Sequence, residues 1–285
     1  LVAGRFTASG LDTTPEQVVV TNGAHQGLSL VARQVLEAGD TVLVESPTFP
    51  GVLDVFRRFG AHAIPVPVDE HGLQVDLLGD LVERTRPRLV YVTPHFHSPT
   101  GAVMPADRRE AIARLADETG LTVIEDLTLA DLAIDEVELP APIGHWARTP
   151  TVHSIGSASK VLWAGLRVGW VRTPESWVTR MLSTKTVADL GSPLLDQLVT
   201  AQLYADLDPI LQQRREELRH RRDTLLAMLA EHLPSWQVQH PAGGLCAWVT
   251  IPEGNAVDLA ELARQHGVAI QPGPALSVDL SLIHI

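Results

Sequence analysis

Short runs of apolar and β-branched residues alternate with longer amphipathic stretches along most of the chain, and this alternation limits the folds open to it. Strands separated by helical stretches are typical of crossover connections in a largely parallel sheet, so we expect an α/β fold. Several runs are almost entirely apolar, which predicts strands that are buried on both faces. The seven candidate strands span residues 17–21, 41–45, 62–66, 88–93, 122–125, 151–155 and 167–172.

Helical patterns occupy several of the intervals between these strands. Residues 24–36 place apolar side chains such as Leu28, Val31 and Val35 on one face, and residues 105–119 begin at a proline, which favours the first turn of a helix. Both stretches are therefore predicted to be crossover helices.

After Pro193 the alternation of short apolar runs and amphipathic stretches gives way to a long charged and leucine-rich stretch, which indicates a domain boundary. The stretch 194–232 is charged and leucine-rich and predicts connecting helices, whereas 235–271 holds short strand candidates around a glycine turn and one helix over 257–266. We therefore predict a large domain, connecting helices and part of a smaller α+β domain, over residues 1–193, 194–234 and 235–279.

Both ends of the chain are typical of a fragment of a longer protein. The chain opens with Leu1 rather than methionine and runs directly into what reads as the end of a helix, over residues 1–8. The last six residues, 280–285, read LSLIHI, the translation expected of a sequencing-adapter tract, so we expect this tail to be artefactual.

Composition excludes several classes of protein. Cys246 is the only cysteine, which rules out an internal disulfide and a cysteine-built metal cluster and is expected of a cytoplasmic protein. No apolar run reaches the roughly 18 to 20 residues of a membrane-spanning helix. The formal charge of −12 opposes phosphate backbones, so we expect no membrane and no nucleic acid to be bound through this segment.

The segment ending at Lys160 is the most informative for chemistry. A lysine in a loop of small residues can be desolvated enough to attack an aldehyde as the neutral amine. Ser157 and Ser159 can donate hydroxyl hydrogen bonds, and Arg167 can supply a fixed positive charge to a phosphate. From chemistry alone, solvated surface side chains remain the competing interpretation.

The motif S-x-S-K followed by G-L-R-x-G-W resembles the cofactor-lysine motif of the fold-type I pyridoxal-phosphate (PLP) enzymes, the class I and II aminotransferases. The resemblance implies that Lys160 forms a Schiff base with PLP. The segment 21–28 is similar to that family's phosphate loop, in which Gly23, Ala24 and His25 offer backbone N–H groups at a helix start, although such a segment alone is also typical of a tight turn. Phe49, in a stretch similar to E-x-P-T-Y-P-G, corresponds to the ring that stacks on the cofactor; its other interpretation is a core side chain.

Two further segments carry the resemblance and also depart from it. Asp126 ends a strand where the family has the carboxylate that keeps the pyridine nitrogen protonated, although a lone Asp there is also typical of a turn or cap. Ser98 stands where the family has the asparagine of N-P-T-G, and Thr128 and Leu129 stand where it has a tyrosine. Both changes weaken hydrogen bonding to the cofactor's phenolic oxygen.

Histidines His95 and His97 are close together in the chain, but H-x-H on a loop lacks a third ligand at a recognisable spacing, so we expect no metal site. We expect His97 to lie near the cofactor instead.

The resemblance extends to about residue 276 and implies fold type I, in which helices sandwich a mainly parallel sheet beside a smaller C-terminal domain. It also implies a homodimer that transfers an amino group between an α-amino acid and a 2-oxo acid, with Lys160 and Asp126 as catalytic residues. The arginine that grips the substrate carboxylate is expected beyond the end of this chain, since the last arginine is Arg264.

Two other functions remain open. The chain fits the effector domain of a MocR-type (GntR-family) transcriptional regulator that binds PLP with little or no turnover and carries a DNA-binding domain in an upstream segment. A β-eliminating lyase or decarboxylase on the same scaffold is a third possibility, because a fold does not fix the reaction.

Overall fold

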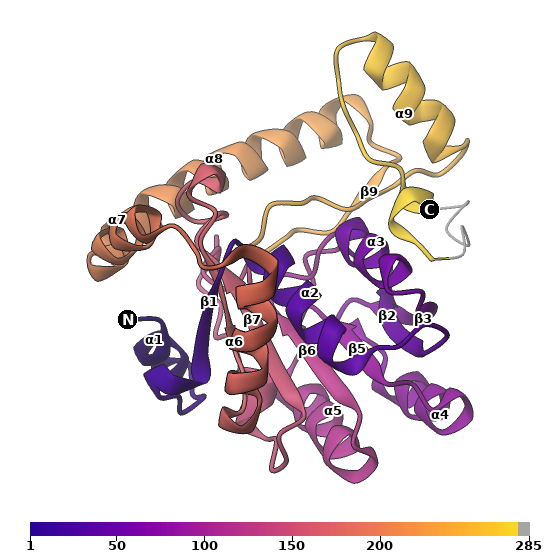
Figure 1. Cartoon of the computed structure of the whole chain (residues 1–285). Coiled ribbons are helices and arrows are strands. Elements are labelled where there is room, and N and C mark those ends of the chain that lie inside the picture. Colours follow the sequence, from indigo (N-terminus) through magenta and orange to yellow (C-terminus); the bar gives the residue numbers. More distant parts are fainter. Residues whose placement is uncertain (279–285) are drawn as a thin grey trace.

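The computed structural model describes residues 1–278 and is built on one eight-stranded sheet (Figure 1). The strands follow the spatial order β1-β8-β7-β6-β5-β2-β3-β4. Their bounds are β1 Val18–Thr21, β2 Thr41–Ser46, β3 His62–Asp69, β4 Gly72–Leu73, β5 Leu89–Val92, β6 Thr122–Asp126, β7 Val152–Ser157 and β8 Gly169–Arg172.

The centre of the sheet is parallel. Strands β3, β2, β5, β6 and β7 pair in parallel, whereas β8 runs antiparallel to both β7 and β1. Parallel strands need long crossovers, and helices supply them here. The α/β class and the mainly parallel sheet expected from the sequence are confirmed.

Helices cover both faces of the sheet, as apolar strands require (Figure 1). One face packs against α2 (Ala24–Val35), α3 (Pro50–Arg58) and α6 (Glu175–Asp189), and the other against α4 (Val75–Thr85) and α5 (Ala106–Thr119). Alternate strand residues divide between the two cores: Val44, Tyr91 and Ile124 face α2 and α3, and Leu43, Val90 and Val123 face α4 and α5.

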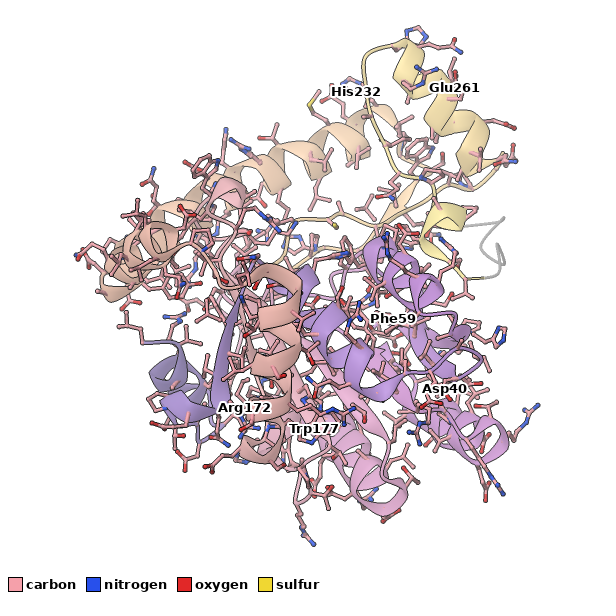
Figure 2. All side chains as sticks on the ribbon, viewed as in Figure 1. Asp40, Phe59, Arg172, Trp177, His232 and Glu261 are labelled. Carbon is pink, nitrogen blue, oxygen red and sulfur yellow. The ribbon has the colours of Figure 1, made fainter. Side chains whose placement is uncertain are left out.

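A third apolar cluster lies beneath the connecting helices and includes Phe6 of α1 (Val2–Ala8), Tyr204 of α7 (Leu194–Ala205) and Leu207 of α8 (Leu207–His232). Beyond α8, β9 (Gln237–Val238) and β10 (Val249–Thr250) form a separate two-stranded sheet, followed by α9 (Ala256–Gln265). Figure 2 shows His232, at the end of α8, and Glu261, in α9, away from the large sheet.

The structure differs from the sequence prediction mainly at element ends. Gln17 belongs to a 3-10 turn (Pro15–Gln17) rather than to β1, because the proline favours a turn there. Arg167 is not in β8, since its positive φ of 52° breaks the extended backbone. Helices α3, α4 and α6 were not singled out from the sequence. The predicted tail, 280–285, lies outside the described residues. Within residues 1–278, no helix is both long and apolar enough to cross a bilayer.

Candidate active site

A cavity of about 290 Å³ opens at the carboxyl ends of the parallel strands. This is the edge at which open α/β sheets bind ligands, and the volume is near the lower end of small-molecule sites, roughly 300–1,000 Å³. Every residue that the sequence predicted for cofactor binding or catalysis lines this one cavity. They are Gly23, Ala24, His25, Phe49, Ser98, Asp126, Ser157, Ser159, Lys160 and Arg167.

The turn from β1 into α2 forms one wall of the cavity. Gly23 is the N-cap of α2 and has a φ of 82°, which a glycine adopts without strain. The first N–H groups of the helix, including those of Ala24 and His25, have no partner one turn back and point out of the helix end. Free N–H groups at a helix start are suited to an anion, which is the role that the sequence predicted for this turn.

Gly169 allows β8 to pass directly behind this turn. A Cβ atom at position 169 would lie 2.5 Å from the carbonyl carbon of Gly23 and 2.7 Å from the nitrogen of Ala24. No side chain fits in that space, so the glycine of the G-L-R-x-G-W motif sets how closely the turn and β8 approach.

Arg167 adds a positive charge beside the same turn. Its guanidinium donates from Nη2 to the carbonyl oxygen of Asn22 at 3.2 Å. A Cβ atom on Gly23 would lie 2.7 Å from this Nη2, so the absence of a side chain at position 23 leaves room for the guanidinium. The cation and the helix N-terminus thus converge, as an anionic group requires.

Asp126 lies at the opposite end of the predicted cofactor position, at the end of β6, and is buried. Its Oδ1 accepts from the N–H of Thr128 at 2.9 Å, and its Oδ2 accepts from the hydroxyl of Tyr91 at 2.5 Å. Burial raises the pKa of Asp126 above its ordinary value, while these hydrogen bonds act in the opposite direction. The carboxylate is held by a donor on each oxygen.

Tyr91 is a site residue that the sequence analysis missed. It lines the cavity from β5, and burial, reinforced by the Asp126 carboxylate, raises the pKa of Tyr91 well above its ordinary value, so its hydroxyl keeps its proton. A signal was available: a tyrosine in an otherwise apolar buried strand needs a partner for its hydroxyl. Which partner it finds depends on the pairing of β5 with β6, where Tyr91 stands opposite Ile124, two residues before Asp126.

Lys160 lies on the loop after β7 and is exposed to solvent at the cavity wall. The desolvation expected from its small-residue surroundings is therefore not present in this chain. Ser157 donates its hydroxyl hydrogen to the carbonyl oxygen of Val168 at 3.2 Å, so that proton is already used. The Oγ atom of Ser159 is buried and has no hydrogen-bond partner among the described residues.

Phe49 and Ser98 form the remaining predicted wall, and the turn after Gly244 faces them. The Phe49 side chain is 42% exposed, so it is not the core residue of the competing interpretation. Leu245 and Cys246 also line the cavity, although the sequence did not assign them to it. The turn that carries these two residues packs closely on the Phe96 ring, because Gly243 has no side chain. A Cβ atom at position 243 would lie 2.4 Å from that ring.

His97 does not line the cavity, which corrects the expectation that it lies near the cofactor. It is buried, with Nδ1 2.8 Å from Thr100 Oγ1 and Nε2 3.2 Å from Glu45 Oε2. His95 instead contacts Arg109 and the carbonyl oxygen of Pro140. The two histidines have different partners, and the described residues include no group of three or more His, Cys, Asp or Glu side chains arranged to hold a metal.

The side chains of this cavity fit a flat aromatic group that carries an anion at one end and a basic nitrogen at the other. Arg167, the start of α2 and the unpartnered Ser159 hydroxyl suit the anion, and Asp126 suits the nitrogen. Apolar side chains of Leu129 and Ile155 line the space between.

The family model described as aminotransferase class I and II matches residues 2–282. The chain is 33% identical to a 2-aminoadipate transaminase of Thermus thermophilus, over 94% of this chain and 69% of that protein. It is 34% identical to an uncharacterized HTH-type transcriptional regulator (YdfD) of Bacillus subtilis, over 93% of this chain but 55% of that protein.

A solved structure, the α-aminoadipate aminotransferase LysN of Thermus thermophilus in complex with N-(5′-phosphopyridoxyl)-L-leucine, superposes with a TM-score of 0.88. It is 32% identical in sequence, and the match covers 95% of this chain and 71% of that one. The chain thus spans little more than half to about two thirds of the length of the curated relatives that it matches.

Proposed function

Because the chain belongs to the class I and II aminotransferase family, we propose that it binds pyridoxal phosphate and transfers an amino group between an α-amino acid and a 2-oxo acid. One observation carries the proposal: Lys160, Asp126 and the phosphate-binding candidates come from separate segments and line a single cavity. The solved relative that holds a phosphopyridoxyl group supports the choice of cofactor.

When bound, PLP supplies an aldehyde for attachment to an amine and a ring that accepts electrons. The N–H groups of Ala24 and His25 and the guanidinium of Arg167 would bind its phosphate, with Ser159 as a further donor. Phe49 would cover one face of the ring. Asp126, held by Tyr91 and Thr128, would keep the ring nitrogen protonated.

Lys160 would be the attachment point, and its released amine would move the proton at the substrate Cα. The composition of the chain favours this assignment, since its only lysines are Lys160 and Lys185. Lys185 is buried in an ion pair with Asp189 and does not line the cavity. Of the two lysines, Lys160 is therefore the one that lines the cavity, and this supports it as the attachment point.

A second copy of the chain is the proposed partner. Apolar side chains are exposed along the end of α6 and the start of α7, including Val187 at 89% and Leu190 at 88%, with Leu194, Leu195 and Leu198 beyond them. Large apolar side chains gathered over one short stretch of chain and exposed to this degree are typical of a protein–protein contact. We expect a homodimer in solution, and Leu195→Asp should shift the mass measured by light scattering from dimer to monomer.

The regulator alternative has its own support, because several curated relatives at 27–34% identity are HTH-type regulators. Ser98, Thr128 and Leu129, which depart from the motif of the transaminases, also fit a domain that binds PLP without fast turnover. Single amino acids added to the PLP-loaded protein separate the two functions. With an amino acid alone, a transaminase completes only the half-reaction that leaves the amino group on the cofactor, so its visible absorbance is lost. A regulator that does not turn over retains it.

The experiment that tests the cofactor assignment is borohydride reduction of the PLP-loaded protein followed by peptide mass spectrometry. We expect the modification on the peptide that contains Lys160 and none on Lys185. Lys160→Ala should lose both the modification and the visible absorbance, while Lys185→Arg should retain both. Modification of Lys185 or of the N-terminal amine alone would contradict the proposal.

A further inference from the structure

Four polar side chains join the end of α6 to the predicted phosphate turn. The carboxylate of Asp189, the last residue of α6, accepts from Asn22 Nδ2 at 2.7 Å and from Gln26 Nε2 at 2.8 Å. The same carboxylate accepts from Lys185 Nζ at 2.9 Å on Oδ1 and 2.8 Å on Oδ2. None of these contacts is needed to explain the chemistry at Lys160 or Asp126.

The Lys185–Asp189 pair is largely shielded from water. The two side chains are 8% and 14% exposed. Burial alone would raise the pKa of Asp189, but the hydrogen bonds from Lys185 and Gln26 lower it below its ordinary value. The carboxylate is thus anionic at neutral pH, and the ammonium group of Lys185 balances its charge. Buried ion pairs persist only when their remaining hydrogen bonds are satisfied, and Asn22 and Gln26 do this here.

The same side chains reach the groups that face the phosphate. Gln26 Oε1 accepts from the backbone N–H of Asn22 at 2.8 Å, so Gln26 bridges Asp189 and the turn. The carbonyl oxygen of Asn22 in turn accepts from Arg167 Nη2. Asn22, the residue before Gly23, is thereby held at both of its backbone groups: Asp189 acts on its N–H through Gln26, and Arg167 donates to its carbonyl oxygen.

We propose that Asp189 is a positioning residue for the phosphate turn: together with Lys185 it holds Asn22 and Gln26 so that the start of α2 and Arg167 keep the geometry that binds the cofactor phosphate. The inference rests on the proposed binding of pyridoxal phosphate. It concerns only the phosphate end of the cofactor, so it predicts no change in contacts with the ring.

The sign of the effect separates positioning from simple electrostatics. A carboxylate near a phosphate site repels the phosphate, so removing the charge of Asp189 should tighten phosphate binding if charge alone mattered. If Asp189 holds the turn in place, removing its charge should weaken binding, although the net charge becomes more favourable.

The test compares pyridoxal phosphate with pyridoxal, which lacks the phosphate, in binding titrations followed by visible absorbance. Asp189→Asn should weaken binding of pyridoxal phosphate by about tenfold or more, the change expected when a charge-assisted hydrogen bond is lost. The affinity of Asp189→Asn for pyridoxal should equal that of the unmodified chain. Asp208→Asn, which removes an exposed carboxylate at the start of α8, is the matched control and should change neither affinity.

Gln26→Leu provides a second variant that keeps the Lys185–Asp189 pair and breaks only the bridge to Asn22; it should show the same phosphate-specific loss. Unchanged or tighter binding of pyridoxal phosphate by both variants would overturn the inference while leaving the proposed function intact. If the unmodified chain bound pyridoxal phosphate no more tightly than pyridoxal, the proposed phosphate site would fail together with the inference.

Discussion

Tyr91→Phe removes one oxygen atom from behind the candidate site and tests the role of Asp126 directly. The hydroxyl of Tyr91 donates to Asp126 Oδ2 at 2.5 Å, and both residues are buried. The ring of Tyr91 packs in the core between the sheet and α2 and is retained in phenylalanine. The variant therefore changes the hydrogen bond and leaves the packing in place.

The magnitude follows from what the hydroxyl does for the carboxylate. A hydrogen bond to a charged group contributes about 1.5–3 kcal/mol. It stabilises the anion, so its loss should raise the pKa of Asp126, and the energy lost corresponds to a factor of about ten or more in the equilibrium between the two protonation states. This increase adds to the one that burial already causes. The Thr128 N–H still donates to Oδ1 and should keep the carboxylate in place.

The assay is the dissociation constant of pyridoxal phosphate as a function of pH. Only the anionic carboxylate pairs with the protonated ring nitrogen, so binding should weaken as the pH falls through the pKa of Asp126. In Tyr91→Phe the midpoint of this weakening should move to higher pH, and at a pH below both midpoints the variant should bind pyridoxal phosphate about tenfold or more weakly than the unmodified chain. Well above both midpoints the two proteins should bind alike.

Tyr204→Phe is the matched control, because it deletes the same atom from another buried tyrosine. Within residues 1–278, the Tyr204 hydroxyl has no hydrogen-bond partner, and this residue does not line the cavity. Its profile should coincide with that of the unmodified chain. If the Tyr91→Phe profile also coincided with it, the hydroxyl would not stabilise the carboxylate and the reasoning would be refuted.

Three further predictions follow from the same structure. Bound pyridoxal phosphate should slow the alkylation of Cys246, the single cysteine, because this residue is exposed on the cavity wall. An unchanged alkylation rate would mean that the cofactor binds somewhere other than this cavity. Gly169→Ala should weaken cofactor binding at least about tenfold, because the added carbon forces β8 away from the turn at Gly23. Gly79→Ala, where the added carbon has nothing within 4 Å, should leave the affinity unchanged. Equal affinities of the two variants would disprove the packing argument. Burial lowers the pKa of His153 to about 3, so as the pH falls the unfolded chain takes up the proton before the folded chain does. The free energy of unfolding should therefore decrease by about 2 kcal/mol between pH 7 and pH 5. Urea unfolding of His153→Asn at these pH values should lack this decrease.

The sequence predicted those site residues whose position depends on local motifs. Gly23 and Arg167 lie in short motifs, and the resemblance of those motifs to the family's singled them out although Arg167 was wrongly expected to begin a strand. The resemblance of local motifs likewise singled out Asp126 and Lys160. Their chemical roles stay predictions, because geometry alone does not test them.

Residues placed by contacts between distant segments were not predicted. Tyr91 meets Asp126 only through the pairing of β5 with β6, and Asp189 meets Asn22 across 167 positions of the chain. Cys246 reaches the cavity because the turn at Gly243 packs on Phe96. No spacing in the sequence encodes such contacts, whereas the motif residues carry their geometry within a few neighbours.

The strongly acidic composition also gave a poor guide to what this cavity can bind. A formal charge of −12 opposes anions in general, yet the predicted phosphate position is surrounded by Arg167 and the start of α2. Over the roughly 8 Å that salt leaves unscreened, the nearest groups determine the potential rather than the sum over the chain. The carboxylate closest to the turn, Asp189, carries its own counter-ion in Lys185. A chain with a strongly negative net charge can therefore hold a phosphate at one point, provided that the nearby acid stays paired.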